Sequence, residues 1–149
     1  MYILYMFEEC LYFNTVKFTR MINSFWEEAY RSTGLSPSHA YLLQFILEQP
    51  GATPKKLAEK MDLKLSTVSR FVDSLAAKGL VERKKENRDK RECSVYPTKS
   101  GINLKDELES ISNNLHRKIR KILGETNVTE AVSLLGKLSV DLNSEKERK

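Results

Sequence analysis

Two helices joined by a short turn are encoded in residues 53–79, TPKKLAEKMDLKLSTVSRFVDSLAAKG. Thr53-Pro54 is a helix start, because threonine caps a first turn well and proline at the first helical position gives up only an N–H that has no partner there. The apolar residues of this first helix follow at helical spacing: Leu57, Ala58 and Met61. A turn around Asp62-Leu63 separates it from the second helix, which ends where Gly79 can adopt the left-handed closing conformation. The pattern predicts a helix-turn-helix.

The second of these helices has an apolar and a polar side. The residues expected to face the core are Leu65, Val68, Phe71, Val72 and Leu75. The residues left on or near the outer face, at the N-terminal end, are Ser66, Thr67, Ser69 and Arg70. Small hydroxyl side chains let a helix enter a major groove and bond to phosphates or base edges, and an arginine there can contact guanine. These four residues are therefore predicted to bind DNA; the alternative is a helical pair in a bundle with a solvated polar face.

A basic hairpin is predicted directly after the second helix. Residues 80–84 can form a strand, 85–90 a charged tip and 91–96 a returning strand that Pro97 ends. Its cationic residues are Arg83, Lys84, Lys85, Arg88, Lys90 and Arg91. A short hairpin buries little, so such a density of cations indicates an anionic partner, and an arginine at its tip can enter a narrow minor groove. The hairpin is thus interpreted as a DNA-binding wing, with a basic loop of no function as the alternative.

Helices are expected on both sides of this central region. Residues 7–30 show uninterrupted helical spacing, and Ser36-Pro37 starts a helix that stops at Pro50-Gly51. After the hairpin, Thr98 can cap a helix that continues to Ile122, and Asn127-Val-Thr-Glu130 resembles a capping box for the last helix. The predicted fold class is mainly α with a small β wing, in a single domain over residues 1–149. The winged helix-turn-helix lobe is assigned to residues 36–97, and residues 144–149 are expected to be a frayed tail.

The distribution of charge favours a polyanionic partner. The net charge is +5, and residues 51–91 hold twelve basic but only six acidic side chains. A basic middle third is typical of a nucleic-acid-binding face, although a merely solvated surface gives the same count. The sequence has no glycine-rich phosphate loop, no metal-ligand cluster and no Ser/His/Asp set that pattern alone pairs. We therefore expect a protein that is not an enzyme and needs no cofactor or metal.

The number of cysteines and the apolar N-terminal residues indicate where the protein is located in the cell. Cys10 and Cys93 are too few for a disulfide-stapled fold and have no zinc-site spacing. Residues 1–7 are apolar but lack a cationic start and are too short to cross a bilayer. A cytoplasmic protein with no membrane partner is the resulting expectation.

The quoted segments together closely resemble the MarR (multiple antibiotic resistance regulator) family. The matching runs are residues 64–79, 80–83, 87–91 and 97–101. In that family an Asp-x-Arg motif is followed, several residues later, by Leu-Thr-x-x-Gly. Asp89 and Arg91 fill the first motif, and Thr98 and Gly101 fill the second, whereas Pro97 replaces the usual leucine. The resemblance spans nearly the whole chain.

This resemblance implies a homodimer whose dimerisation helices lie in residues 1–33 and 98–143. Each subunit would place the helix after the turn in a major groove, with Arg88, Lys90 and Arg91 of the wing at the flanking minor groove and Asp89 positioning the wing arginine. The implied function is a sequence-specific regulator of transcription that binds double-stranded DNA. The family favours a repressor on a palindromic operator, released by a small aromatic ligand or by oxidation. The alternative is a basic helical interaction or architectural protein without sequence-specific readout.

The same resemblance implies two candidate sites at which an oxidant or a ligand would release the protein from DNA. One branch of the family senses peroxide through a cysteine in the first helix, which makes Cys10 a candidate redox sensor; a small apolar residue in the dimer interface is the alternative. The family often binds aromatic or phenolic anions between its helices. The candidate pocket residues here, which plain core packing would equally explain, are Phe25, Trp26, Tyr30, His39, Tyr41 and Phe45.

Overall fold

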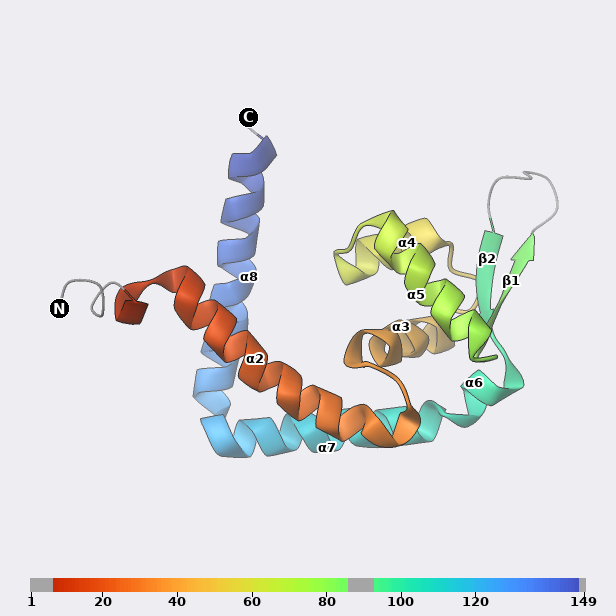
Figure 1. Ribbon diagram of the computed structural model, residues 1–149, viewed down its shortest axis with the longest axis horizontal. Helices are drawn as coiled ribbons and strands as arrows, with labels where there is room; N and C mark the ends of the chain where they lie inside the picture. Colours follow the sequence, from red (N-terminus) through yellow and green to blue (C-terminus); the bar gives the residue numbers. More distant parts are fainter. Residues whose placement is uncertain (1–6, 86–92, 148–149) are drawn as a thin grey trace. The chain divides into compact units, whose positions relative to one another are not determined.

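The computed structural model describes residues 7–85 and 93–147, which form a mostly helical chain with a two-stranded antiparallel sheet (Figure 1). The chain divides into two compact units, residues 1–111 and 112–149. The first unit contains α2 (Leu11–Tyr30), the 3-10 turn η1 (Arg31–Thr33), α3 (Pro37–Glu48), α4 (Pro54–Met61), α5 (Leu65–Ala77), β1 (Val81–Lys85), β2 (Cys93–Pro97) and α6 (Lys99–Asn103). The helix α7 (Lys105–Leu123) crosses the division, and α8 (Glu125–Glu147) lies in the second unit. The predicted class, mainly α with a small β hairpin after a helix-turn-helix, is confirmed.

The predicted helix starts are formed by the expected side chains. Ser36 accepts a hydrogen bond from the backbone N–H of His39 (3.4 Å), and Thr53 accepts one from that of Lys56 (3.3 Å). In both helices a proline occupies the first helical position. Thr98 caps α6 in the same way. These caps satisfy N–H groups that a helix cannot pair internally.

The core of the first unit is built mainly from α3, α5 and the hairpin. Its completely buried large side chains include Leu42, Leu43, Ile46, Val68, Val72, Leu75 and Val95. Leu65 was predicted to join them, but its side chain is 51% exposed, so that prediction is wrong. Leu65 is the first residue of α5, and only from Val68 onward does the apolar side of α5 lie in the core.

Strand β1 begins and ends one residue later than predicted, and β2 ends one residue later than predicted. The strands were expected at 80–84 and 91–96, with Pro97 outside. Instead Pro97 is the last residue of β2 and lies opposite Val81, the first residue of β1. Proline is tolerated at a strand end, where its missing N–H interrupts little of the ladder.

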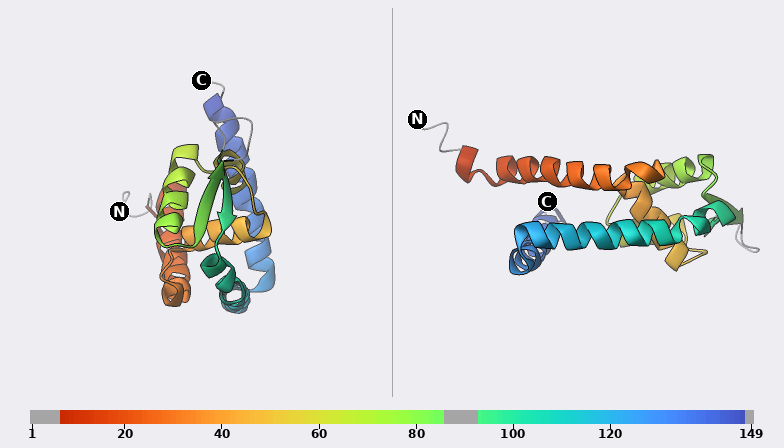
Figure 2. Two further views of the ribbon diagram at one scale, coloured as in Figure 1. Left: turned by 90° about the vertical axis from the view of Figure 1, so that its right-hand side faces the viewer. Right: turned by 90° about the horizontal axis from the view of Figure 1, so that it is seen from below.

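A further backbone contact ties the hairpin to the helix-turn-helix. The N–H of Val95 donates to the carbonyl of Ala52 (3.0 Å), and the N–H of Gly51 donates to the carbonyl of Val95 (2.8 Å). In Figure 2 (left) the two strands lie side by side, with β1 next to α5 and β2 next to α3. The hairpin therefore has a fixed place beside α5.

The predicted continuous helix over residues 7–30 is interrupted. Residues 7–9 are helical, but Cys10 is extended (φ −74°, ψ 114°) and α2 begins at Leu11. The side-chain amide of Asn14 donates to the carbonyls of Glu8 (2.8 Å) and Cys10 (3.0 Å). Asn14 thus bonds carbonyls at the end of the preceding turn, which stabilises the break.

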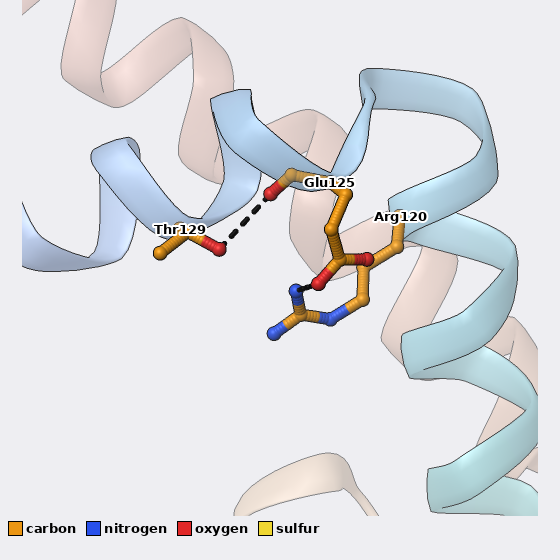
Figure 3. Close-up of polar contacts among 3 residues, drawn as sticks. All are labelled: Arg120, Glu125 and Thr129. Carbon is orange, nitrogen blue, oxygen red and sulfur yellow. Dashed lines mark hydrogen bonds and ion pairs between the residues drawn. The ribbon is translucent and has the colours of Figure 1, made fainter.

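Two predictions for the last helices are corrected. The helix after Thr98 is divided at Leu104 into α6 and α7. The capping box at 127–130 is wrong, because α8 already begins at Glu125, after Gly124 with φ +90°. The hydroxyl of Thr129 donates to the carbonyl of Glu125 (3.0 Å), as in a helix interior, and Glu125 forms an ion pair with Arg120 (Figure 3). Asn127 likewise donates to the carbonyl of Leu123 (2.7 Å) rather than capping an N–H.

Candidate nucleic-acid interface

The exposed side of α5 carries the predicted DNA-binding residues at its N-terminal end. Ser66 and Arg70 are exposed, whereas Thr67 and Ser69 are half-buried. The positive end of the helix dipole lies at this same end, where it favours contact with an anion. The four residues therefore lie together on one helix, with Ser66 and Arg70 the most accessible of them.

The turn before α5 fixes the direction of this helix. Asp62 adopts the left-handed conformation (φ 52°), which few residues other than glycine, asparagine and aspartate tolerate. The N–H of Leu63 then donates to the carbonyl of Ala58 (3.0 Å), which closes α4. The Lys64 carbonyl accepts from the N–H groups of Thr67 and Val68 and so begins α5. The predicted turn around Asp62-Leu63 is thereby confirmed.

The base of the hairpin is held against α5 by an ion pair that the sequence did not predict. The guanidinium Nη2 of Arg83 lies 2.9 Å from Oδ1 of Asp73 and donates to the carbonyl of Ser69 (3.2 Å). Arg83 was predicted to meet an anionic partner outside the protein, but here its partners lie on α5. The available signal was Asp73, an acidic residue on the polar side of a helix with basic surroundings. The sequence pattern did not identify which cation would pair with it.

The next residues of β1 differ in their contacts. The ammonium of Lys84 lies 2.9 Å from Oε1 of Glu82 and 5.1 Å from the ring centre of Tyr96. Lys85 is exposed. Arg88, Asp89, Lys90 and Arg91, which carry the predicted wing contacts, lie outside the described residues.

A shallow groove of about 340 Å³ lies between the start of α4, the start of α5 and the hairpin. Its lining includes Lys55, Leu65, Ser69, Arg83 and the half-buried thiol of Cys93. The exposure of Leu65 is explained by this position, because one side of its side chain borders the groove rather than the core.

The six predicted pocket residues make several kinds of contact. Trp26 donates from its indole N–H to the hydroxyl of Tyr41 (3.0 Å), and the rings of Tyr30 and Tyr41 lie edge-on, 6.0 Å apart. His39 instead packs against Phe71 of α5, with ring centres 4.6 Å apart.

The remaining two pocket residues are on α2 and α3. Phe45 faces the Lys60 ammonium at 5.6 Å, and Phe25 is half-buried on α2. Tyr30 is fully buried. An aromatic ligand site formed by all six side chains stays a prediction.

His39 links the start of α3 to α5. Its Nδ1 lies 2.6 Å from the hydroxyl of Ser36, the capping residue of the same helix. Burial, and secondarily the positive charge of Lys78, lower the pKa of His39 below its usual value. These contacts fit the alternative given for this histidine, plain core packing.

Cys10 is a free, half-buried thiol just before α2. Tyr12 is two residues further on and exposed, whereas Tyr41 is hydrogen-bonded to Trp26. The redox role of Cys10 stays a prediction.

Large apolar side chains are exposed on the first and last long helices. On α2 they are Leu11, Tyr12, Phe13, Phe18 and Met21, and on α8 they are Val132, Leu134, Leu135, Val140 and Leu142. Exposed apolar surface of this extent marks an interaction site. Within the described part of the chain, no helix is both long enough and apolar enough to span a membrane.

Comparison with known proteins agrees with this geometry. A model of the MarR family matches residues 33–92, which extend from η1 through α3, α4, α5 and β1. The HTH-type transcriptional regulator BilQ of Clostridium symbiosum (strain WAL-14163) is 24% identical over 131 residues, spanning 88% of this chain and 91% of BilQ.

Solved structures share the fold. The S. aureus MepR–DNA complex matches with a TM-score of 0.79 and 20% identity, over 90% of this chain and 99% of MepR. CouR from Rhodococcus jostii RHA1 bound to p-coumaroyl-CoA matches with a TM-score of 0.71 and 22% identity, over 89% of this chain and 93% of CouR. The family-model match over residues 33–92 and these relatives support a MarR-type winged-helix regulator of transcription rather than an enzyme.

Proposed function

We propose that this MarR-family regulator is a repressor that binds a palindromic operator in double-stranded DNA as a homodimer. The carrying observation is the exposed N-terminal end of α5, where Ser66 and Arg70 lie beside a basic hairpin. The structural likeness to MepR, which was solved with DNA, supports the same use of the fold.

The DNA contacts are assigned to two elements. Ser66, Thr67, Ser69 and Arg70 of α5 enter a major groove, where side chains can distinguish all four base pairs. Arg88, Lys90 and Arg91 contact the flanking minor groove, with Asp89 positioning Arg91. Residues 36–97 form this DNA-binding lobe.

The dimer is assigned to residues 1–33 and 98–143, with 144–149 as a tail. The apolar side chains exposed on α2 and α8 support it, since a second copy of the chain would cover them. A two-fold dimer places its two α5 helices in half-sites about 34–36 Å apart, one turn of DNA. This spacing explains why the operator is expected to be an inverted repeat.

Release by a small aromatic or phenolic ligand, or by oxidation of Cys10, completes the proposal. The cluster of Trp26, Tyr30 and Tyr41 offers aromatic faces and a hydroxyl. CouR, which has the same fold, was solved with p-coumaroyl-CoA. Peroxide and phenolic acids should then lower the affinity for the operator; a DNA affinity that peroxide leaves unchanged would remove the sensor role of Cys10.

Selection from random duplex DNA tests the main proposal. The purified protein selects duplexes, and fluorescence anisotropy then gives the affinity for selected and random sequences over a range of salt concentrations. Selection of an inverted repeat bound at least about a thousandfold more tightly than random DNA is the expected result. Weak binding that is indifferent to sequence would instead support the architectural alternative.

Arg70→Ala is expected to weaken operator binding by about 1–3 kcal/mol, because a bidentate contact to guanine would be lost. The loss should be confined to operators that keep the contacted base pair, and it is measured as the dissociation constant on single-base variants. Lys78→Ala, at the other end of α5, is the matched control for charge. An equal loss on random DNA would identify Arg70 as a phosphate contact.

Arg91→Ala is expected to weaken binding to all duplexes and to make the salt dependence shallower. Loss of one phosphate contact reduces the slope of log K against log salt by about 0.9. Arg117→Ala removes an exposed charge from α7, outside the lobe, and should leave the slope unchanged. A wild-type slope for Arg91→Ala would argue against a groove contact.

A further inference from the structure

One guanidinium nitrogen makes both an ion pair and a hydrogen bond between α5 and β1. Nη2 of Arg83 lies 2.9 Å from Oδ1 of Asp73 and also donates to the backbone carbonyl of Ser69, 3.2 Å away. The side chain of Arg83 is 36% exposed and that of Asp73 65% exposed. The hairpin is therefore joined to α5 by an ion pair that both residues form at the protein surface.

Asp73 lies on the DNA-facing side of α5. Ser66, Arg70 and Asp73 are all exposed and follow one another at intervals of four and three residues, so they share one helix face. A carboxylate on this face repels phosphates, and such a residue is costly in a helix that binds DNA unless a cation neutralises it. Arg83 provides that cation from the neighbouring strand.

The same contact has a second consequence. Because Nη2 of Arg83 bonds to Asp73 and to the Ser69 carbonyl, this nitrogen is directed to α5, and the charge of Asp73 offsets the attraction of Arg83 for an outside phosphate. Phosphate contacts raise the affinity for every DNA sequence equally and so add no specificity. A carboxylate that pairs with an arginine at the edge of the interface therefore lowers the affinity for every duplex and leaves the ratio of operator to random affinity unchanged.

We propose that Asp73 limits the sequence-independent affinity for DNA and that Arg83 is a positioning residue. The Asp73–Arg83 pair sets the hairpin against α5, and it weakens the attraction of one guanidinium for the DNA backbone. This inference rests on the proposed DNA-binding function.

The test compares charge-removing variants on two duplexes, the selected operator and a random sequence of equal length. The variants are Asp73→Asn, Arg83→Gln and the two combined, and anisotropy gives each affinity across salt concentrations. Glu59→Gln is the matched control, because it removes one exposed carboxylate from the adjacent helix α4 without altering the pair. Circular dichroism checks that each variant is folded, as expected for an exposed pair that contributes little to stability.

Asp73→Asn is expected to bind both duplexes more tightly, and its salt slope should steepen by about 0.9 as Arg83 gains a phosphate. Both affinities should rise by the same factor, so their ratio stays unchanged, and this gain should shrink on the order of threefold over a fourfold rise in salt. The steeper slope should disappear when Arg83→Gln is added, and Glu59→Gln should keep the wild-type slope. Arg83→Gln alone should lower both affinities, since Asp73 is then not neutralised.

Two results would overturn the inference while leaving the proposed function intact. One is an Asp73→Asn variant with the wild-type salt slope and the wild-type affinities for both duplexes. The other is a steeper slope that persists in the double variant, because Arg83 would then not be its source. A wild-type protein that prefers no duplex would overturn the proposed function itself, and this is seen before any variant is measured.

Discussion

Gly101→Ala is expected to lower the free energy of unfolding by about 3 kcal/mol, the upper part of the range for an overpacked core. A Cβ atom at Gly101 would lie 2.2 Å from the carbonyl oxygen of Leu80, well inside contact distance. For a chain of this size the loss corresponds to a melting temperature about 6–12 °C lower. Thermal and denaturant unfolding at one fixed protein concentration measure it, because the stability of a dimer depends on concentration.

The backbone near Gly101 cannot easily move away from the added methyl group. The Leu80 carbonyl accepts a hydrogen bond from the N–H of Thr98 (3.0 Å), and the hydroxyl of Thr98 donates to the carbonyl of Gly79 (2.6 Å). The Thr98 hydroxyl also caps the N–H of Gly101 (3.2 Å), so α6 is tied to the end of α5. Ser100→Ala, at the exposed neighbouring position, is the control and should change stability by less than about 0.5 kcal/mol. Equal melting temperatures for the two variants would contradict this account.

The parts of the fold that sequence predicts well are those set by neighbouring residues. Thr53 and Pro54 start α4 because capping and a fixed φ act within one turn, and Gly79 ends the next helix by a local backbone conformation. Thr98 caps α6 for the same reason. The helix-turn-helix and the hairpin after it follow from such signals, and so the fold class and the family could be predicted.

The errors arise where a side chain had more than one possible partner. Asparagine is a common helix cap, but the side-chain amide of Asn127 donates to the Leu123 carbonyl. It does so because α8 starts after Gly124, two residues before Asn127. Asn14 breaks the first helix by bonding carbonyls on its N-terminal side, which no periodicity of apolar residues reveals. Local patterns place a polar residue on a helix without determining its partner.

The candidate site was predicted in its residues but not in its long-range contacts. The polar side of α5 follows from helical spacing, and Ser66 and Arg70 are exposed as expected. The pair of Asp73 and Arg83 joins residues ten positions apart on a helix and a strand, and its formation depends on how the hairpin turns back. The angle between the hairpin and α5 is a property of tertiary packing, which local sequence patterns do not determine.

Leu135→Asp is expected to convert the protein to a monomer and to weaken operator binding by about 10²–10⁴-fold, the gain that two linked sites normally provide. Leu135 is 48% exposed, and Val128, Val132 and Leu142 fall on the same side of α8 at helical spacing. A carboxylate at the centre of this apolar stripe would be buried without a partner in any dimer that covers it. Light scattering gives the oligomeric state, and anisotropy gives the affinities for the full operator and for a single half-site.

Ser133→Asp is the matched control, since residue 133 is exposed on the opposite side of α8 and the substitution adds the same charge. It should remain a dimer with wild-type operator affinity. If Leu135→Asp is a monomer and binds a half-site as well as the wild type does, the loss on the full operator comes from the broken dimer and not from a damaged α5. A Leu135→Asp variant that stays dimeric would mean that the apolar side of α8 does not hold the two subunits together. A monomer with full operator affinity would mean that one subunit suffices for recognition, and the inverted repeat would then need another cause.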